Sequence, residues 1–317
     1  MRQLELQLRV PAERLERPNE TRECEFRGMC SGVSANELFL ADFENDVLRI
    51  FDVRTGQLDA RDVYRCAAGE SPTGVAYSAH TDTLFVASFG INTQTVRSFA
   101  RTNAEWCECH RLDLSADPHH RVSLRALSDG SLVFGVEWVS AELQMLAVDD
   151  SRAMQTRARI RLPGAHRGFD AQLAAGETRL AVALRTDVVA LFRVAGDRAV
   201  ELARCPLRCL MRPLFCRDSL LALVSTGDGC VVQELCTGGG RLEARRVLLN
   251  GLKTSSDVCW CVVNDSLLAA WGLEDETPTL TLYNIQGRNQ LGGPGGRAPP
   301  PSKKLGPPSK MWLFIVS

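Results

Sequence analysis

Residues 38–52 read Leu38-Phe-Leu-Ala-Asp-Phe-Glu-Asn-Asp-Val-Leu-Arg-Ile-Phe-Asp52. A continuous apolar run opens this stretch, a polar turn follows it, and a second run from Leu48 to Phe51 mixes apolar and polar residues. Continuous apolar runs are typical of strands that are buried on both faces, and alternating runs are typical of strands with one exposed face. The stretch therefore predicts two antiparallel strands joined by a short turn.

The same pattern recurs along the chain. Six apolar runs share this form, and the last residues of successive runs lie 46, 48, 48, 41 and 46 positions apart. A second strand follows each run, a further candidate strand precedes it, as at Thr73–Tyr77, and an outer one lies beyond, as at Arg61–Tyr64. A four-stranded unit with this period is typical of propeller blades. We therefore predict an all-β fold, a β-propeller of about six four-stranded blades over residues 27–288. The sequence leaves open a seventh, degenerate blade and an unclosed ring.

Blade-like motifs support this prediction. Leu38–Asp52 resembles a blade of the NHL-repeat family, with Ala41-Asp42, Asn45 and Phe51-Asp52 at positions where that family places such residues, although Val47 stands where arginine is usual. Leu84–Phe99 is similar to YVTN-type propeller repeats, and Phe51–Gly56 resembles the end of a WD40 repeat. The resemblance implies the propeller fold over residues 27–288 and points to no particular protein.

The two ends of the chain lie outside the repeats. Residues 1–26 begin with apolar and polar residues in alternation, so this segment is a candidate strand that closes the ring by completing the last blade. The competing candidate for that strand is Met311–Val316. Residues 289–317 form a Gly/Pro-rich basic tail, which we expect to be flexible.

Composition excludes several classes of protein. A formal net charge of -1 weighs against nucleic acid and an anionic membrane as partners. The N-terminus lacks the apolar stretch of a secretory signal, and no run approaches the roughly 18 apolar residues that span a bilayer. We therefore expect a soluble, cytoplasmic protein whose twelve cysteines stay reduced, and we expect no cofactor and no structural metal.

Charge separates the two predicted ends of the ring. The loops between second and third strands hold ten acidic residues against Arg185, whereas each loop between third and fourth strands holds an arginine. An acidic rim favours a basic peptide or a cation. The alternative is that these acids only form turns, where Asp is common because it bonds the local backbone. The candidate residues of this binding face are Asp42, Glu44, Asn45, Glu137, Trp138, Asp187, Asp228 and Trp271.

Two functions follow from this face. No nucleophile elbow, zinc-protease motif or phosphate-binding loop occurs, so we predict a non-catalytic scaffold that presents propeller loops to a protein or peptide partner. Trp138 and Trp271 are candidate anchors for that partner, or else they cover blade edges. The alternative comes from the resemblance: some six-bladed propellers hold a divalent cation at the channel mouth and act as hydrolases or lactonases. The acidic residues of the face and Asn45 are the only set that could converge as oxygen ligands.

Overall fold

The computed structural model describes residues 4–285 apart from short segments, and the rest of the chain is not described. One compact unit covers Met1–Gly287, and a second unit, Arg288–Ser317, lies outside the described residues, as does the candidate strand Met311–Val316. The undescribed segments within the first unit are 19, 21, 35, 104, 115–121, 128, 137–141, 163–168, 174–178, 185–187, 196–197, 208, 217–218, 227–228, 238–240, 254–257, 265 and 273–277.

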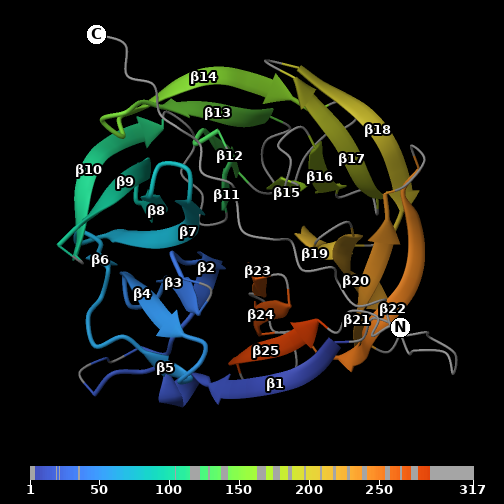
Figure 1. Cartoon of the computed structure of the whole chain (residues 1–317), viewed down its shortest axis with the longest axis horizontal. Coiled ribbons are helices and arrows are strands. Elements are labelled where there is room, and N and C mark those ends of the chain that lie inside the picture. Colours follow the sequence, from blue (N-terminus) through green and yellow to red (C-terminus); the bar gives the residue numbers. More distant parts are fainter. Residues whose placement is uncertain are drawn as a thin grey trace, which may run out of the picture. The chain divides into compact units, whose positions relative to one another are not determined.

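Six antiparallel sheets make up the first unit, which confirms the predicted six-bladed β-propeller. Each sheet is one blade, and its strands follow one another from the axis outward (Figure 1). Blade 1 contains β2 (Phe26–Ser31), β3 (Glu37–Asp42), β4 (Val47–Asp52), β5 (Gln57–Leu58) and β6 (Tyr64–Arg65). Blade 2 contains β7 (Glu70–Ser78), β8 (Thr83–Gly90), β9 (Gln94–Thr102) and β10 (Glu105–Leu114). Blade 3 contains β11 (Val122–Ala126), β12 (Leu132–Val136), β13 (Glu142–Val148) and β14 (Met154–Arg161).

The second half of the ring repeats this arrangement. Blade 4 contains β15 (Phe169–Leu173), β16 (Arg179–Leu184), β17 (Val188–Ala195) and β18 (Arg198–Pro206). Blade 5 contains β19 (Cys209–Cys216), β20 (Ser219–Thr226), β21 (Gly229–Cys236) and β22 (Glu243–Leu252). Blade 6 contains β23 (Cys259–Asn264), β24 (Leu267–Trp271) and β25 (Thr279–Ile285), together with β1 (Leu4–Pro11). A single 3-10 turn, η1 (Ala12–Arg14), follows β1.

The ring closes through its innermost strands. Each first strand contacts the first strand of the next blade, and β2 contacts β23, so the series β2, β7, β11, β15, β19 and β23 returns to its start (Figure 1). The fit between blades 1 and 2 is close, because a Cβ on Gly28 would lie 2.8 Å from the Cα of Gly74. Glycine at both positions therefore lets the backbones of β2 and β7 approach.

The N-terminal strand completes the last blade. β1 pairs antiparallel with β25 from Leu4 opposite Ile285 to Pro11 opposite Thr279, so β25 has no open edge along this length. Leu4 and Val10 are buried beneath the strand, and the residues between them are mostly exposed. The first strand of the chain thus holds the last blade in the ring.

The core lies between the blades. Six hydrophobic clusters of described residues each join side chains of two neighbouring blades, and together they cover all six interfaces of the ring. The predicted apolar runs supply their centres, since Leu38–Ala41 and Leu84–Ala87 are 0% exposed. Burial on both faces explains why these runs are continuously apolar. Within the described segments, no helix has the length and apolar character needed to cross a membrane.

Candidate functional site

The predicted acidic rim is described only in part. The turns between second and third strands lie where the sequence analysis placed them, but the turns of blades 3 to 6 contain undescribed residues. Glu137, Trp138, Asp187 and Asp228 belong to those turns and lie outside the described residues. The charge of the whole rim therefore stays a prediction.

Asp42 of blade 1 does not belong to a surface rim. Its carboxylate is 0% exposed and lies 2.7 Å from Nη2 of Arg49 on the neighbouring strand β4. The Nδ2 group of Asn45 donates to Asp42 Oδ2 at 3.0 Å, so this amide is also committed to the cluster. Burial raises the pKa of the Asp42 carboxyl, and the nearby Arg49 guanidinium opposes that rise. The structure gives Asp42 a structural partner in place of an external ligand.

Arg49 extends this cluster to the N-terminal segment. Its guanidinium is 0% exposed, lies 2.6 Å from Oε1 of Glu20, and donates to the carbonyl oxygen of Leu15 at 3.2 Å. Both partners belong to the stretch that leads from β1 into blade 1. The cluster of Asp42, Arg49 and Glu20 therefore fixes that stretch against β4, next to the point where the ring closes.

The other described candidates differ in exposure. Trp271 is 1% exposed, and its ring lies edge-on to Phe26 of blade 1 at 4.6 Å, so its indole packs in the core between blades 6 and 1 and is not available as a surface anchor. Glu44 is partly exposed, and its carboxylate lies 3.8 Å from Arg22. Glu44 and Asn45 stay candidates for a binding face. Among the described residues, no group of three or more His, Cys, Asp or Glu side chains is arranged to hold a metal ion.

A pocket that the sequence analysis did not predict lies between blades 1 and 2. Arg61–Tyr64 was expected to be the outer strand of blade 1, but that strand is divided into the short β5 and β6. The N–H of Asp59 donates to the carbonyl oxygen of Ile50 at 2.8 Å, and the N–H of Val63 donates to that of Leu48 at 2.9 Å. Residues 60–62 therefore bulge out of the sheet, as extra residues in a strand generally do.

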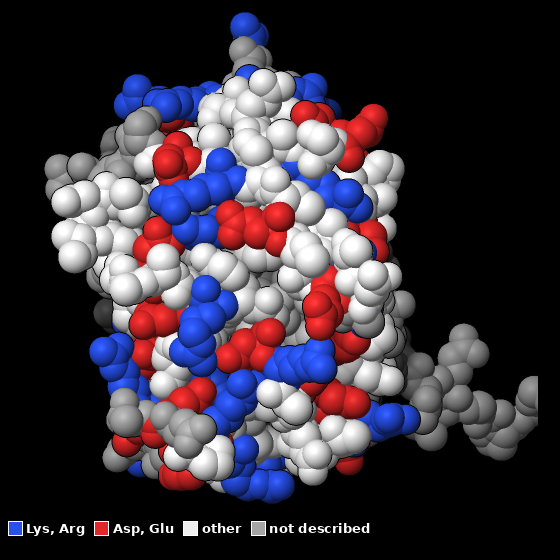
Figure 2. Space-filling model, turned by 90° about the vertical axis from the view of Figure 1, so that its left-hand side faces the viewer, with Lys and Arg blue, Asp and Glu red and all other residues white. Residues whose placement is uncertain are grey.

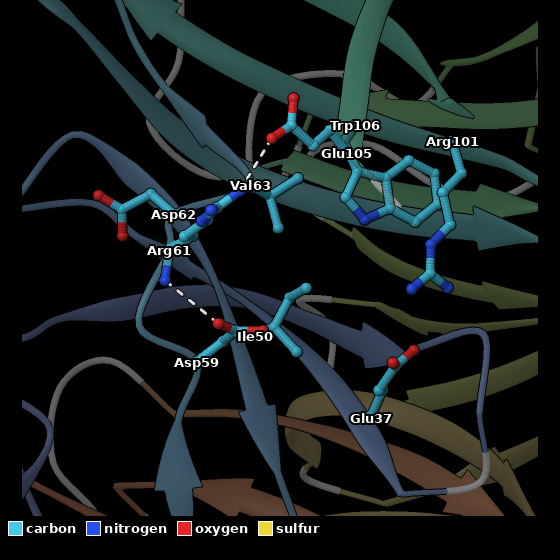
Figure 3. Close-up of a pocket in the computed structure, with 9 residues that line it drawn as sticks. All are labelled: Glu37, Ile50, Asp59, Arg61, Asp62, Val63, Arg101, Glu105 and Trp106. Atoms are coloured by element: carbon cyan, nitrogen blue, oxygen red, sulfur yellow. Dashed lines mark hydrogen bonds and ion pairs between the residues drawn. The ribbon is translucent and has the colours of Figure 1, made fainter. Parts of the chain in front are cut away.

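This bulge and the hairpin of β9 and β10 enclose a cavity of about 270 Å³ (Figure 3). We call it the blade 1–2 pocket. Ile50, Val63 and Trp106 supply its apolar surface. Its charged residues come from three segments: Glu37 from the start of β3, Asp59, Arg61 and Asp62 from the bulge, and Arg101 and Glu105 from the β9–β10 hairpin.

Part of the charged lining is engaged in ion pairs. Arg61 Nη1 lies 2.8 Å from Oε1 of Glu105, which links the bulge to β10 across the two blades (Figure 3). Asp62 lies 2.8 Å from Arg17 and 3.1 Å from Arg65. The remaining charges are those of Glu37, Asp59 and Arg101. Figure 3 shows Glu37 and Arg101 on the same side of the pocket, each with its charged group directed toward the other.

Trp106 has a fixed place in the pocket wall. Its ring lies edge-on to Phe39 at 5.7 Å and to Tyr77 at 6.4 Å, with interplanar angles of 78° and 82°. Trp106 packs against these rings, but it is only half-buried and also borders the cavity. One sequence signal could have revealed the pocket: apolar and polar residues do not alternate regularly over residues 57–65, as they do in a regular outer strand.

The outer wall around the pocket carries charges of both signs. Figure 2 views the molecule from the left-hand side of Figure 1, where β4, β6 and β10 lie, and shows basic and acidic side chains interspersed there. Such a wall gives no field of a single sign over a long range. The wall therefore has no long-range electrostatic attraction for a partner of one sign of charge.

Solved structures share this fold at low sequence identity. The β-propeller domain of Cps50 (Swd1) from Myceliophteria thermophila is 12% identical with a TM-score of 0.58, over 90% of this chain and 100% of that chain. A PQQ-bound aldose sugar dehydrogenase from Streptomyces coelicolor is 8% identical with a TM-score of 0.61, over 90% and 99%. A chain of a mitotic checkpoint complex is 10% identical with a TM-score of 0.55, over 89% and 95%. No protein-family model and no curated protein matches the chain. These likenesses show the fold alone.

Proposed function

We propose that this protein is a non-catalytic interaction scaffold that presents propeller loops and the blade 1–2 pocket to a protein or peptide partner. The observation that carries the proposal is the pocket, which lies where the outer strand of blade 1 is divided. The other five blades have continuous outer strands, whereas blade 1 replaces its outer strand with a bulge that helps to line a cavity. Irregularities of this kind are often conserved devices that re-aim side chains.

The chemistry of the pocket supports binding more than catalysis. Sites for drug-sized ligands and cofactors usually occupy roughly 300–1,000 Å³, and this cavity of about 270 Å³ is no larger than the smallest of them. A protruding side chain of a partner fits such a space. The described lining contains no histidine, cysteine, serine or lysine, and two of its carboxylates, those of Asp62 and Glu105, are held in ion pairs with arginines.

The comparisons support the same proposal. Two of the similar folds belong to a Cps50 propeller domain and to a chain of a mitotic checkpoint complex. The sugar dehydrogenase has an equally similar fold, so the fold itself is compatible with catalysis as well. The hydrolase alternative relied on Asp42 as one ligand, and the burial of that carboxylate against Arg49 lends the alternative no support.

Two finer expectations belong to this proposal. The NHL-like character of blade 1 is supported by its sequence motif, and by the turn-side bonds that Asp42 and Asn45 make with each other. A cytoplasmic location is supported by the cysteines, since the eleven that the structure describes are all free thiols. We also expect neither nucleic acid nor a membrane as the partner, because the net charge is close to zero.

A charge-reversal experiment tests the proposal. The full chain and a variant with Asp59→Arg and Glu105→Arg are used to capture proteins from a cell extract, with quantitative mass spectrometry as the readout. Both residues are exposed, so the fold is expected to tolerate the changes. The matched control is Glu201→Arg with Glu243→Arg, which reverses two charges on the outer strands of blades 4 and 5.

The proposal predicts proteins that the wild type and the control capture in near-stoichiometric amounts and the pocket variant does not. Each such protein is then purified and titrated against the three chains by calorimetry. Equal capture by all three chains would move the partner site away from the pocket. Absence of any partner, together with binding of a divalent cation and hydrolysis of a lactone or ester, would support the enzyme alternative.

A further inference from the structure

We infer that the blade 1–2 pocket binds the side chain of an arginine presented by a peptide partner. This inference rests on the proposed scaffold function and names the chemistry that its pocket recognises. Three features of the pocket carry it: the size of the cavity, the excess of carboxylates in its lining, and the place of Trp106. Each feature concerns residues whose side chains are described.

The size of the cavity selects a long side chain. Its lining combines an apolar surface from Ile50, Val63 and Trp106 with charged groups. Arginine matches this division, because its methylene stem covers apolar surface while its guanidinium stays with polar groups. An aliphatic side chain would leave the carboxylates without a partner in a partly enclosed space, which costs free energy.

Two carboxylates of the lining, those of Glu37 and Asp59, favour a cation. Glu37, Asp59, Asp62 and Glu105 contribute four carboxylates, whereas Arg61 and Arg101 contribute two guanidinium groups. Asp62 already lies within ion-pair distance of Arg17 and Arg65, and Glu105 is paired with Arg61. Glu37 and Asp59 remain as the acceptors for a guest. Their side chains accept backbone N–H groups, from Ser34 to Glu37 and from Arg61 to Asp59.

Trp106 favours arginine among the cations. A guanidinium is planar and weakly hydrated, so it stacks on an indole while its N–H groups donate in their own plane to carboxylates. Phe39 and Tyr77 hold the indole in place, which lowers the entropic cost of presenting it to a guest. A lysine ammonium is a more strongly hydrated point charge and gains less from the same surface.

A substitution at Arg101 distinguishes a cationic occupant of the pocket from an acidic one. Its charged group lies at the pocket beside Glu37, and the side chain is exposed. A cationic guest is repelled by Arg101, so Arg101→Gln strengthens binding of arginine. An acidic guest would need Arg101 as its partner, so the same change would abolish binding. One substitution therefore gives opposite results for the two kinds of occupant.

The test uses the full chain with 5-fluorotryptophan at its tryptophan positions and ¹⁹F NMR as the readout. The Trp106 resonance is assigned with a Trp106→Phe variant, and the buried Trp260 and Trp271 serve as internal references. The probes are N-acetylarginine N-methylamide and the analogous amides of citrulline, lysine and glutamate. Citrulline has nearly the shape of arginine but carries no charge.

The expected result is a saturable shift of the Trp106 resonance with arginine, and binding at least ten times weaker with citrulline and glutamate. Glu37→Gln with Asp59→Asn removes this preference, while both amides keep an oxygen that accepts the existing backbone bonds. The control, Glu201→Gln with Glu243→Gln on the outer strands of blades 4 and 5, keeps the preference. Arg101→Gln strengthens arginine binding.

Several results would overturn the inference: no shift with arginine, equal binding of citrulline, or loss of binding in Arg101→Gln. If removal of residues 288–317 creates arginine binding that the full chain lacks, the occupant is the chain's own basic tail. Loss of partner capture in the charge-reversed variant without any arginine shift would leave the scaffold function standing with a different occupant. If the pocket variant captures the same proteins as the wild type and arginine gives no shift, both the proposed scaffold function of the pocket and its proposed occupant are refuted.

Discussion

Replacing Arg49 with methionine tests how the ring is held at its point of closure. The guanidinium is fully buried and lies 2.7 Å from Asp42, 2.6 Å from Glu20 and 3.2 Å from the carbonyl oxygen of Leu15. Methionine fills a similar volume but leaves the buried Asp42 carboxylate without its counter-charge. Removal of one partner from a buried pair costs about 3–5 kcal/mol. For the unit Met1–Gly287 that loss corresponds to a fall in Tm of about 5–8 °C, because the entropy of unfolding grows with chain length.

The loss depends on pH with a definite sign. Burial raises the pKa of Asp42 above its ordinary value of 3.8, and Arg49 opposes the rise, so Arg49→Met raises the pKa further. A carboxyl with a raised folded-state pKa loses stability as the pH increases through that value. The difference between wild type and Arg49→Met is therefore smallest near pH 4 and reaches its full size once the pH exceeds the raised pKa.

Thermal unfolding followed by circular dichroism between pH 4 and pH 8 measures both effects. Addition of Asp42→Asn to Arg49→Met should restore part of the lost stability at neutral pH, because it removes the uncompensated charge. Arg61→Met is the control, since the Arg61–Glu105 pair is 80% and 67% exposed and such pairs contribute at most about 1 kcal/mol. A Tm for Arg49→Met equal to that of the control, or a difference independent of pH, would refute the reasoning.

Four other features of the ring give further predictions. Gly28→Ala should lower the free energy of unfolding by about 1–3 kcal/mol in chemical denaturation, because the new methyl group meets the backbone of Gly74; an unchanged midpoint would mean that β2 shifts freely. Deletion of residues 1–11 removes the buried Leu4 and Val10, worth about 3–6 kcal/mol together, and should speed amide exchange in β25 more than in β12. Trp271→Ala should cost about 3–5 kcal/mol and leave partner capture by the folded chain unchanged; selective loss of capture would restore Trp271 as an anchor. A thiol reagent should modify the exposed Cys107, Cys109 and Cys236 before the buried cysteines, which should react only on unfolding.

The blade count was predictable because it depends on periodicity. Each blade buries its second strand on both faces, so every repeat carries a continuous apolar run such as Leu38–Ala41 whatever the rest of its sequence. Even blades without recognisable motifs keep that run, because the interfaces between blades require it. The pairing of β1 with β25 was foreseen as one of two candidates, since the alternating apolar residues of the N-terminal segment are typical of an outer strand.

Side-chain environments at the ends of strands were harder to predict. Trp271 comes at the end of an apolar run beside a turn, which suggested the surface, but it packs on Phe26, which is distant in sequence. Asp42 was predicted to belong to the binding face because it follows directly after an apolar run, and its counter-ion Arg49 lies in an alternating strand that gives no sign of burial. One signal was available: Arg97 occupies the position in blade 2 that corresponds to Arg49, and both are buried ion-pair partners.

The pocket could not be predicted because it arises from an exception to the repeat. Its apolar surface joins Ile50 and Val63 of one blade to Trp106 of the next. Sequence periodicity says where blades meet, but it does not say that residues 60–62 leave the sheet. Residues 57–65 lack the regular apolar–polar alternation of an outer strand. Ordinary loops lack it too, so this pattern does not by itself identify a bulge.

The pairing of β1 with β25 has a consequence for how the protein is made. Pro11 pairs with Thr279, so a ribosome that adds about 5–20 residues per second takes roughly 13–54 s to supply the partner of the first strand. Throughout that time the nascent chain carries an unpaired strand and an uncovered apolar face on blade 1, which are targets for chaperones. A truncated translation product never receives the partner of β1, and the open edge distinguishes it from the finished protein.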